Sequence, residues 1–257
     1  MMRNYEKRNA VLIKLTLWAL TILVFLPFLW LLKEAGPNYL VSIKYLSLDQ
    51  NGIVMVWLKN SAFFTLAALF ISVLSSITAG FVLAILKVPL RRFMLFVTLI
   101  TMLIPITAMA MPLYVLIDKI HLNDNIWGLI IASSYYPFGT FLSYLYFVSA
   151  LAGDLVGMGR IDGLGDWGLY WHLGIPLSKA LWSIVIFFSF LSLWNSYQLP
   201  KVLLNDPAHS TLPMGLELLY GNSTAIVGVL MMLPIILLYL LSQRSIERGI
   251  FSGAVKG

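Results

Sequence analysis

Residues 15–32 read LTLWALTILVFLPFLWLL, a run of 18 residues that contains no charged side chain. A helix of about 20 apolar residues crosses the hydrocarbon core of a bilayer, so this run predicts a membrane span. A secretory signal peptide is the alternative, because a basic segment precedes the run. The run is longer than the core of a signal peptide, and no small-x-small cleavage site follows it. We therefore interpret it as the first of several spans.

The rest of the chain has the same character. Of its 257 residues, 60% are hydrophobic and 11% are charged, and the mean hydropathy is +0.89. A soluble domain is only about 45–50% apolar. We predict an all-α integral membrane protein with six transmembrane helices. The predicted spans are residues 11–32, 57–86, 93–117, 125–149, 179–204 and 226–243.

Basic residues predict the orientation of these spans. If the loops alternate between the two sides of the membrane, twelve of the 17 Lys and Arg residues fall on one side and five on the other. Because basic loops are retained in the cytoplasm, the side with twelve is predicted to be inside. Both termini and the loops 87–92 and 150–178 would then lie in the cytoplasm.

Composition also argues against several functions. The net charge of +6 is scattered between apolar blocks, which is typical of membrane topology and does not predict a nucleic-acid surface. Cysteine is absent, and His121, His172 and His209 lie in different loops without ligand spacing, so no metal site is predicted. The spans hold almost none of the ionisable residues that ion-coupled carriers use. No G-x-x-x-x-G-K-[ST] phosphate loop is present, so active transport would need an ATPase on another chain.

One inside loop is long and partly apolar: residues 150–178 read ALAGDLVGMGRIDGLGDWGLYWHLGIPLS. Apolar residues at three-residue spacing predict a short amphipathic helix, and glycines then allow a turn before a second apolar surface. The helix contains Leu155, Met158 and Ile161, the turn Gly163 and Gly165, and the second surface Trp167, Leu169, Tyr170 and Leu173. Such a helix lies either on the membrane surface or on a partner protein, and the residues alone leave both open.

This loop resembles the cytoplasmic coupling loop of ABC importer permeases. In that family Glu-Ala-Ala is followed after three residues by Gly and, nine residues later, by Ile-x-Leu-Pro. Here Gly163 and Pro176 have the same separation, with Leu173 and Ile175 as conservative replacements, and Arg160–Gly163 matches the R-I-D-G core of the carbohydrate branch.

Further stretches resemble the same branch, in the same order along the chain. They are Trp57-Leu58-Lys59-Asn60-Ser61, Pro105 through Pro112-Leu113-Tyr114, Asn123 through Gly128, Pro137 through Leu142, and the maltose-type ending at Gln243-Arg244, Gly249 and Gly253 through Gly257. The chain is thus identified as similar to permease subunits of the carbohydrate, maltose-type, binding-protein-dependent family.

One departure concerns the coupling loop. Where the family has Glu-Ala-Ala, this chain has Gly157-Met158-Gly159. A glycine in a helix costs about 0.5–1 kcal/mol relative to alanine, so two glycines weaken the predicted helix by roughly 1–2 kcal/mol. We expect docking on a partner to supply part of the missing order.

The resemblance implies a type I importer permease with six transmembrane helices and a cytoplasmic coupling helix, in the cytoplasmic (inner) membrane of a prokaryote, for a sugar or an oligosaccharide. Residues 1–56 would hold an N-terminal cytoplasmic segment, the first span and an external loop. Residues 57–257 would form the permease core, with the coupling loop at about 150–178 and a tail at 244–257.

The resemblance also implies partners. They are a second permease subunit in a hetero- or homodimer, a dimeric cytoplasmic ATPase and an extracytoplasmic solute-binding protein. ATP and Mg would be bound by the ATPase, and this chain would bind no cofactor. The residues implied to contact the ATPase are Asp154, Gly157, Met158, Gly159, Arg160, Ile161, Asp162, Gly163, Leu164 and Pro176, with Gly253, Ala254, Val255 and Lys256 of the tail.

Polar and aromatic positions on otherwise apolar helices are candidates for the translocation path, because sugars bind through hydrogen bonds and aromatic faces. Ser and Asn at such positions also serve as packing contacts between helices, and this alternative stays open. Prolines 105, 112 and 137 either kink spans toward a cavity or only shape the bundle. The candidate path residues are Thr107, Met109, Tyr135, Tyr136, Ser192, Asn195, Ser196 and Tyr197.

Three other functions remain as alternatives at this point. One is a permease for glycerol phosphate or another small solute, and the second is a secondary transporter, which the lack of buried charge disfavours. The third is a membrane-embedded enzyme, which would need convergent acid, base or metal-binding residues near the interface.

Overall fold

The computed structural model describes residues 2–36, 52–151, 153–219 and 222–254, and the regular structure in these ranges is helical throughout. The longer helices are α1 (Met2–Ala35), α3 (Ile53–Ile85), α4 (Arg91–Leu103), α5 (Ile106–Lys119), α6 (Ile126–Ser133), α7 (Pro137–Ala150), α8 (Gly153–Ile161), α11 (Lys179–Trp194) and α14 (Asn222–Ala254). The shorter ones are α9 (Asp166–Leu169), the π-helix η1 (Tyr170–Gly174), α10 (Ile175–Leu177), α12 (Gln198–Leu203), α13 (Leu212–Gly215) and the 3-10 helix η2 (Leu216–Leu218).

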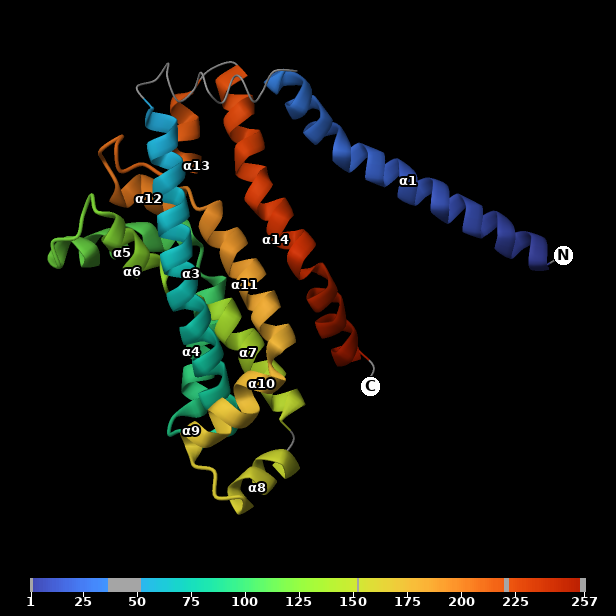
Figure 1. Cartoon of the computed structure of the whole chain (residues 1–257), viewed down its shortest axis with the longest axis vertical. Helices are drawn as coiled ribbons and strands as arrows, with labels where there is room; N and C mark the ends of the chain where they lie inside the picture. The colour runs from blue at the N-terminus through green and yellow to red at the C-terminus, as the bar shows by residue number, and fades with distance from the viewer. Residues whose placement is uncertain (1, 37–51, 152, 220–221, 255–257) are drawn as a thin grey trace.

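The helices account for the predicted spans. Three segments, in α1, α3 and α14, are long and apolar enough to cross a membrane alone, and counting each of three bent helix pairs as one span gives up to six. Figure 1 shows α8 and α9 at one end of the long axis and α12 and α13 at the other, with α1 running away from the remaining helices. The all-α membrane fold predicted from hydropathy is therefore confirmed.

Helix α3 is the centre of the bundle. It contributes buried side chains to each of three apolar clusters, which it shares with α13 and α14, with α6 and α12, and with α7, η1 and α11. Its members in these clusters include Trp57, Phe64, Ile77 and Phe81, each nearly inaccessible to solvent. A helix that is apolar on all sides is expected to be surrounded in this way.

Small residues let α3 and α7 approach closely. Ser76 and Gly80 on α3 face Gly139 and Ser143 on α7, so the same four-residue step occurs on both helices. A Cβ added at Gly80 would lie 2.3 Å from the Cβ of Ser143, and one at Gly139 would lie 2.9 Å from Ser76 Oγ. Close approach through small side chains is the usual way in which helices associate in membranes, where water no longer drives apolar burial.

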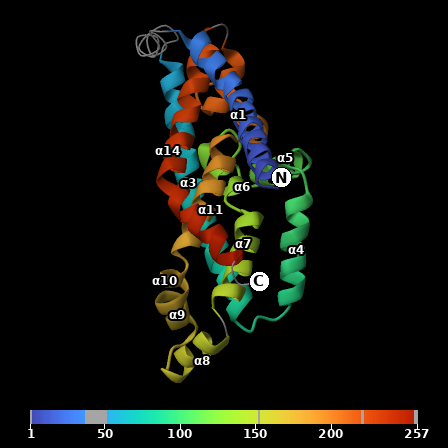
Figure 2. The ribbon, with the colours of Figure 1, turned by 90° about the vertical axis from the view of Figure 1, so that its right-hand side faces the viewer.

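Three of the predicted spans are interrupted. The sequence left kinks at Pro105 and Pro137 open as an alternative, and it did not predict the break after Trp194. The span predicted at 93–117 is two helices, α4 and α5, bent by 109°. At the bend, Ile104 is extended (φ −77°, ψ 121°) and precedes Pro105, which begins the next turn. Proline disfavours a helical residue before it and offers no N–H for the helix ladder, so the bend occurs here. Figure 2 shows α5 turning across the end of α4.

The other two interruptions lie further along the chain. The span predicted at 125–149 consists of α6 and α7, and the span predicted at 179–204 ends at Trp194, before the separate helix α12. The last span is longer than predicted, because α14 continues to Ala254 through most of the segment taken as a tail.

Candidate functional site

The interruptions of the three spans meet at one cavity of about 450 Å³. Ile106 reaches it from the bend between α4 and α5, Tyr136 from the break between α6 and α7, and Ser196 from the break between α11 and α12. Backbone that is not helical is stable at membrane depth only where protein covers it or where it lines a cavity. The lining is Ile106, Ala132, Ser133, Tyr135, Tyr136, Ser189, Ser192, Leu193, Asn195, Ser196, Tyr197, Gln198 and Leu199.

Proline accounts for the other two breaks as well as for the bend at Pro105. Pro137 begins α7 and has no N–H to donate to the carbonyl of Ser133, four residues earlier. In the same way Pro200, within α12, has none for the carbonyl of Ser196. Ser76 on α3 supports the first break, because its hydroxyl donates to the carbonyl of Tyr136 at 3.1 Å.

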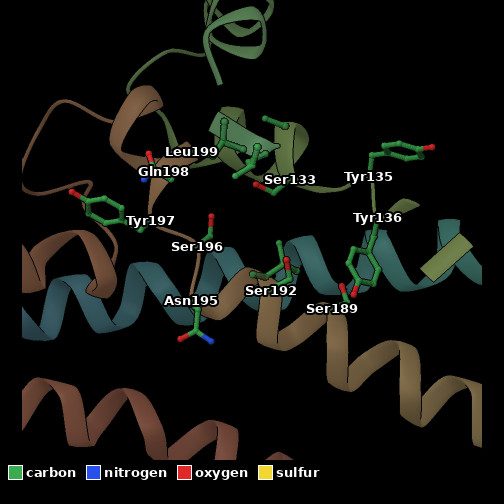
Figure 3. Close-up of a pocket in the computed structure, with 13 residues that line it drawn as sticks. Ser133, Tyr135, Tyr136, Ser189, Ser192, Asn195, Ser196, Tyr197, Gln198 and Leu199 are labelled. Carbon is green, nitrogen blue, oxygen red and sulfur yellow. The ribbon is translucent and has the colours of Figure 1, made fainter. Parts of the chain in front are cut away.

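Six of the eight path residues predicted from sequence line this cavity, namely Tyr135, Tyr136, Ser192, Asn195, Ser196 and Tyr197. Figure 3 shows Ser192 between Ser196 and Tyr136, with Tyr135 and Tyr197 at opposite ends of the lining. Thr107 and Met109 lie on α5 and are not part of the lining. Three polar lining residues, Ser133, Ser189 and Gln198, were not among the predicted path residues. Ser133 and Gln198 lie within four residues of Pro137 and Pro200, and Ser189 lies on the same helix as Ser192, so each had a signal in the sequence.

An ion pair lies at the Tyr197 end of the cavity. The Lys201 ammonium donates to Glu217 Oε1 at 2.7 Å and to the Tyr197 hydroxyl at 2.6 Å, and that hydroxyl also contacts Glu217 Oε2 at 2.6 Å. The bond to Glu217, followed by the bond to Tyr197, raises the pKa of Lys201, and the bond to Lys201 lowers the pKa of Glu217. Both groups therefore stay charged, and the positive charge of Lys201 on α12 is balanced by the negative charge of Glu217 on η2.

At the opposite end of the molecule, α8 carries an exposed apolar stripe. Leu155, Met158 and Ile161 are all exposed, and Ile161 is 87% accessible. Trp167 and Trp171 add two further exposed rings on α9 and η1. The predicted amphipathic helix is confirmed, and its apolar side points away from the rest of the chain. Asp154 and Asp162 are exposed in the same segment.

A tight turn follows α8. Gly163 has φ +82°, a left-handed conformation that glycine adopts without steric cost. The Arg160 guanidinium spans the turn, since it donates to the carbonyl of Leu164 at 3.2 Å and forms an ion pair with Asp166. Because both charged side chains are about half exposed, the ion pair adds little to the free energy of folding, and its main effect is to fix the shape of the turn.

The segment after the turn is packed against α3. The hydroxyl groups of Tyr170 and Thr78 are 2.8 Å apart, and the rings of Tyr170 and Phe81 meet edge-on at 5.1 Å. Gly174 lets Phe81 approach, because a Cβ there would lie 3.0 Å from the phenyl ring. This segment is thus in direct contact with the central helix. Pro176 lies beyond, on α10.

The two glycines that replace Glu-Ala-Ala have different surroundings. A Cβ at Gly157 would meet nothing within 4 Å, whereas one at Gly159 would lie 2.7 Å from Leu169 Cδ2 and 3.4 Å from Leu164 Cδ1. The structure keeps α8 helical through both positions. The absence of a side chain at Gly159 therefore leaves room for the side chains of Leu164 and Leu169.

The W-x-x-N-S stretch holds the loop between α12 and α13. Trp57 Nε1 donates to the carbonyl of Pro207 at 2.7 Å, and Asn60 Nδ2 donates to the carbonyls of Ala208 and Ser210 at 2.8 and 3.0 Å. The hydroxyl oxygen of Ser61 accepts from the N–H of Leu212 at 2.7 Å. All three motif residues thus fix residues 207–212, which connect α12 to α13.

Asp124 fixes the other half of this loop. Its Oδ1 accepts from the N–H groups of Asn205 and Asp206 at 2.9 and 3.1 Å and lies 3.2 Å from His209 Nδ1. Burial raises the pKa of Asp124, but these hydrogen bonds outweigh it and the pKa is lowered overall. Asp124, Asp206 and His209 lie within 4.8 Å of one another. Since Asp124 Oδ1 is already occupied by loop N–H donors, the arrangement is explained as a loop anchor.

Of the predicted tail contacts, Gly253 and Ala254 form the end of α14, and Val255 and Lys256 lie outside the described residues.

Comparison with known proteins places this geometry in a family. Residues 76–252 match the family described as binding-protein-dependent transport system inner membrane component. The chain is 29% identical over 239 residues to the arabinooligosaccharides transport system permease protein AraQ of Bacillus subtilis, covering 88% of this chain and 85% of that protein. It is 27% identical over 266 residues to the diacetylchitobiose uptake system permease protein NgcG of Streptomyces coelicolor, covering 94% and 87%.

A solved structure supports the fold. A chain of a bacterial ABC transporter involved in the import of the acidic polysaccharide alginate matches with a TM-score of 0.75 and 21% identity, covering 94% of this chain and 96% of that one. A likeness at this identity shows the fold and not the solute. The family match covers more than half of the chain and includes all three of the breaks that meet at the cavity. The chain therefore belongs to the family of binding-protein-dependent inner-membrane transport components, as a permease subunit and not an enzyme.

Proposed function

We propose that this chain forms one wall of an ATP-driven importer for a sugar or an oligosaccharide, and that the cavity is its part of the translocation path. The observation that carries the proposal is the meeting of three interrupted spans at one cavity with polar and aromatic walls. The names of the two relatives, which refer to arabinooligosaccharides and diacetylchitobiose, support the solute class.

A second permease is needed to complete the path. Ser192, Asn195 and Gln198 line the cavity but are exposed on the isolated chain. Uncovered polar side chains at membrane depth are costly unless they face water or another protein. A second subunit, identical or related, supplies the opposite wall.

Energy reaches the cavity through the coupling segment, residues 153–177. The exposed stripe of α8 docks on a dimeric cytoplasmic ATPase, which binds ATP and Mg, and the contact of Tyr170 with Thr78 and Phe81 passes the movement to α3. The excess of basic residues on one side supports a cytoplasmic position for this segment and for both termini. An extracytoplasmic binding protein delivers the solute at the opposite face.

The experiment is reconstitution of the permease pair, the ATPase and the binding protein in liposomes. Uptake is followed with radiolabelled arabinotriose, diacetylchitobiose and sn-glycerol 3-phosphate, with ATP on the ATPase side and the binding protein on the other. We expect uptake of a saccharide that stops when ATP or the binding protein is omitted. Uptake driven by a proton or sodium gradient without ATP would instead identify a secondary transporter. Import of sn-glycerol 3-phosphate in place of a saccharide would reject the solute class.

A further inference from the structure

The polar lining of the cavity is electrically neutral. It consists of hydroxyl and carboxamide side chains with aromatic rings, and among the described residues it contains no Asp, Glu, Lys, Arg or His. The polar members are Ser133, Tyr135, Tyr136, Ser189, Ser192, Asn195, Ser196, Tyr197 and Gln198.

Several of these groups have hydrogen-bonding capacity left. Ser133 Oγ is buried and has no hydrogen-bond partner, although the residue lines the cavity. Asn195 uses its Nδ2 on the carbonyl of Leu191 at 2.9 Å, which leaves its oxygen as an acceptor. Ser189, by contrast, is already bonded to Ser72 at 2.8 Å. Hydroxyl and carboxamide groups can both donate and accept, which is the pattern that sugar hydroxyl groups require.

The charges nearest to this lining are cancelled. Lys201 and Glu217 lie next to Tyr197 but pair with one another at 2.7 Å, and neither lines the cavity. Lys201 also donates a hydrogen bond to the Tyr197 hydroxyl, so the polar contacts of Lys201 and Glu217 are made among these three side chains. Among the described residues, the cavity lining therefore contains no cation, and Lys201 beside it is already paired.

We infer that this chain's wall of the path is suited to an uncharged, polyhydroxylated solute, which means a neutral saccharide and not an acidic sugar or a phosphate ester. An anion that leaves water for a wall without a cation loses hydration there and gains no pairing, whereas hydroxyl groups exchange water for the neutral donors and acceptors of the wall. The inference rests on the proposed function, because it concerns the solute of the same cavity.

Charges of opposite sign placed at Ser192 test the inference. Ser192 is exposed and lines the cavity, so substitutions there should not disturb the fold. The pairs are Ser192→Lys with the uncharged Ser192→Met, and Ser192→Asp with the uncharged Ser192→Asn. The complete complex is reconstituted with each variant, and the initial uptake rate is measured for whichever of arabinotriose, diacetylchitobiose and sn-glycerol 3-phosphate the unmodified complex imports fastest.

A neutral solute should be slowed by either charge. We expect Ser192→Lys and Ser192→Asp each to lower uptake about tenfold relative to their uncharged counterparts, and by similar factors. An anionic solute would give opposite signs, with Ser192→Lys at least as fast as Ser192→Met and Ser192→Asp nearly inactive, and this result would overturn the inference while keeping the cavity on the path. Equal uptake by all four variants and the unmodified complex would remove the cavity from the path and overturn the proposed function as well.

Discussion

Replacing Gly80 with leucine is expected to prevent the permease from folding in the membrane. The first added carbon alone would lie 2.3 Å from Ser143 Cβ and 2.8 Å from backbone atoms of Ser143 and Tyr144, so α3 and α7 must move apart. Overpacking a well-packed interface usually costs about 1–3 kcal/mol, and here the obstacle includes backbone that cannot change rotamer. Because α3 contributes to all three apolar clusters, its displacement affects the whole bundle.

The measurement is the yield of monodisperse protein after detergent extraction, together with its thermal unfolding midpoint. Gly153→Leu is the matched control, because a Cβ at Gly153 meets nothing within 4 Å, and its yield should equal that of the unmodified chain. Gly80→Ala should fall between the two, and adding Ser143→Gly should restore part of the loss by removing the Cβ contact. A Gly80→Leu protein as stable as the unmodified chain would show that α3 and α7 do not pack through these residues.

Replacing Ile161 with aspartate is expected to separate the permease from its ATPase. Ile161 is 87% exposed on α8, so the change should leave the isolated chain folded. Burying an isoleucine side chain in a docking site contributes about 1.5–3 kcal/mol, which corresponds to a loss of roughly tenfold to a hundredfold in affinity. A carboxylate in the same apolar contact weakens docking further.

Retention of the ATPase during purification of the complex and ATP-driven uptake measure this effect. Leu90→Asp is the control, because Leu90 is 72% exposed in another loop predicted to be cytoplasmic and has a positive φ that aspartate tolerates. The ATPase should remain bound to this control. Full retention and uptake with Ile161→Asp would exclude the α8 stripe as the docking surface.

The sequence predicted the three unbroken spans and the short helix α8 well, because long apolar runs and helical spacing are local features. The apolar runs gave the positions of α1, α3 and α14, and the spacing of Leu155, Met158 and Ile161 gave α8. The two glycines of α8 lowered the helix stability expected from the sequence. The close packing of Gly159 against Leu169 could not be predicted, because it depends on tertiary structure.

The sequence left open whether the spans break at proline, because proline alone does not decide it. Pro105 and Pro137 stand at interruptions, whereas Pro112 lies inside α5, and Pro27 and Pro234 lie inside α1 and α14. Whether a helix bends at proline depends on what can satisfy the freed backbone groups, such as the Ser76 hydroxyl at Tyr136. The bend also explains why two of the predicted path residues lie elsewhere. Thr107 and Met109 were expected on the path of a straight span, but they lie on α5, which is bent by 109° from α4, and they do not line the cavity.

Accessibility of a single cysteine at Ser192 tests the central claim, that the cavity is this chain's part of the translocation path of an ATP-driven importer. A path of this kind should open to the two sides of the membrane in turn, under control of the ATPase. The chain has no cysteine of its own, so Ser192→Cys provides one reactive group. After uptake by this variant has been verified, a membrane-impermeant maleimide is applied from one side at a time to the reconstituted complex. We predict labelling from the cytoplasmic side only without nucleotide, and from the opposite side only with ATP, orthovanadate and the loaded binding protein. Labelling that ignores nucleotide, or that fails from both sides, would contradict the account.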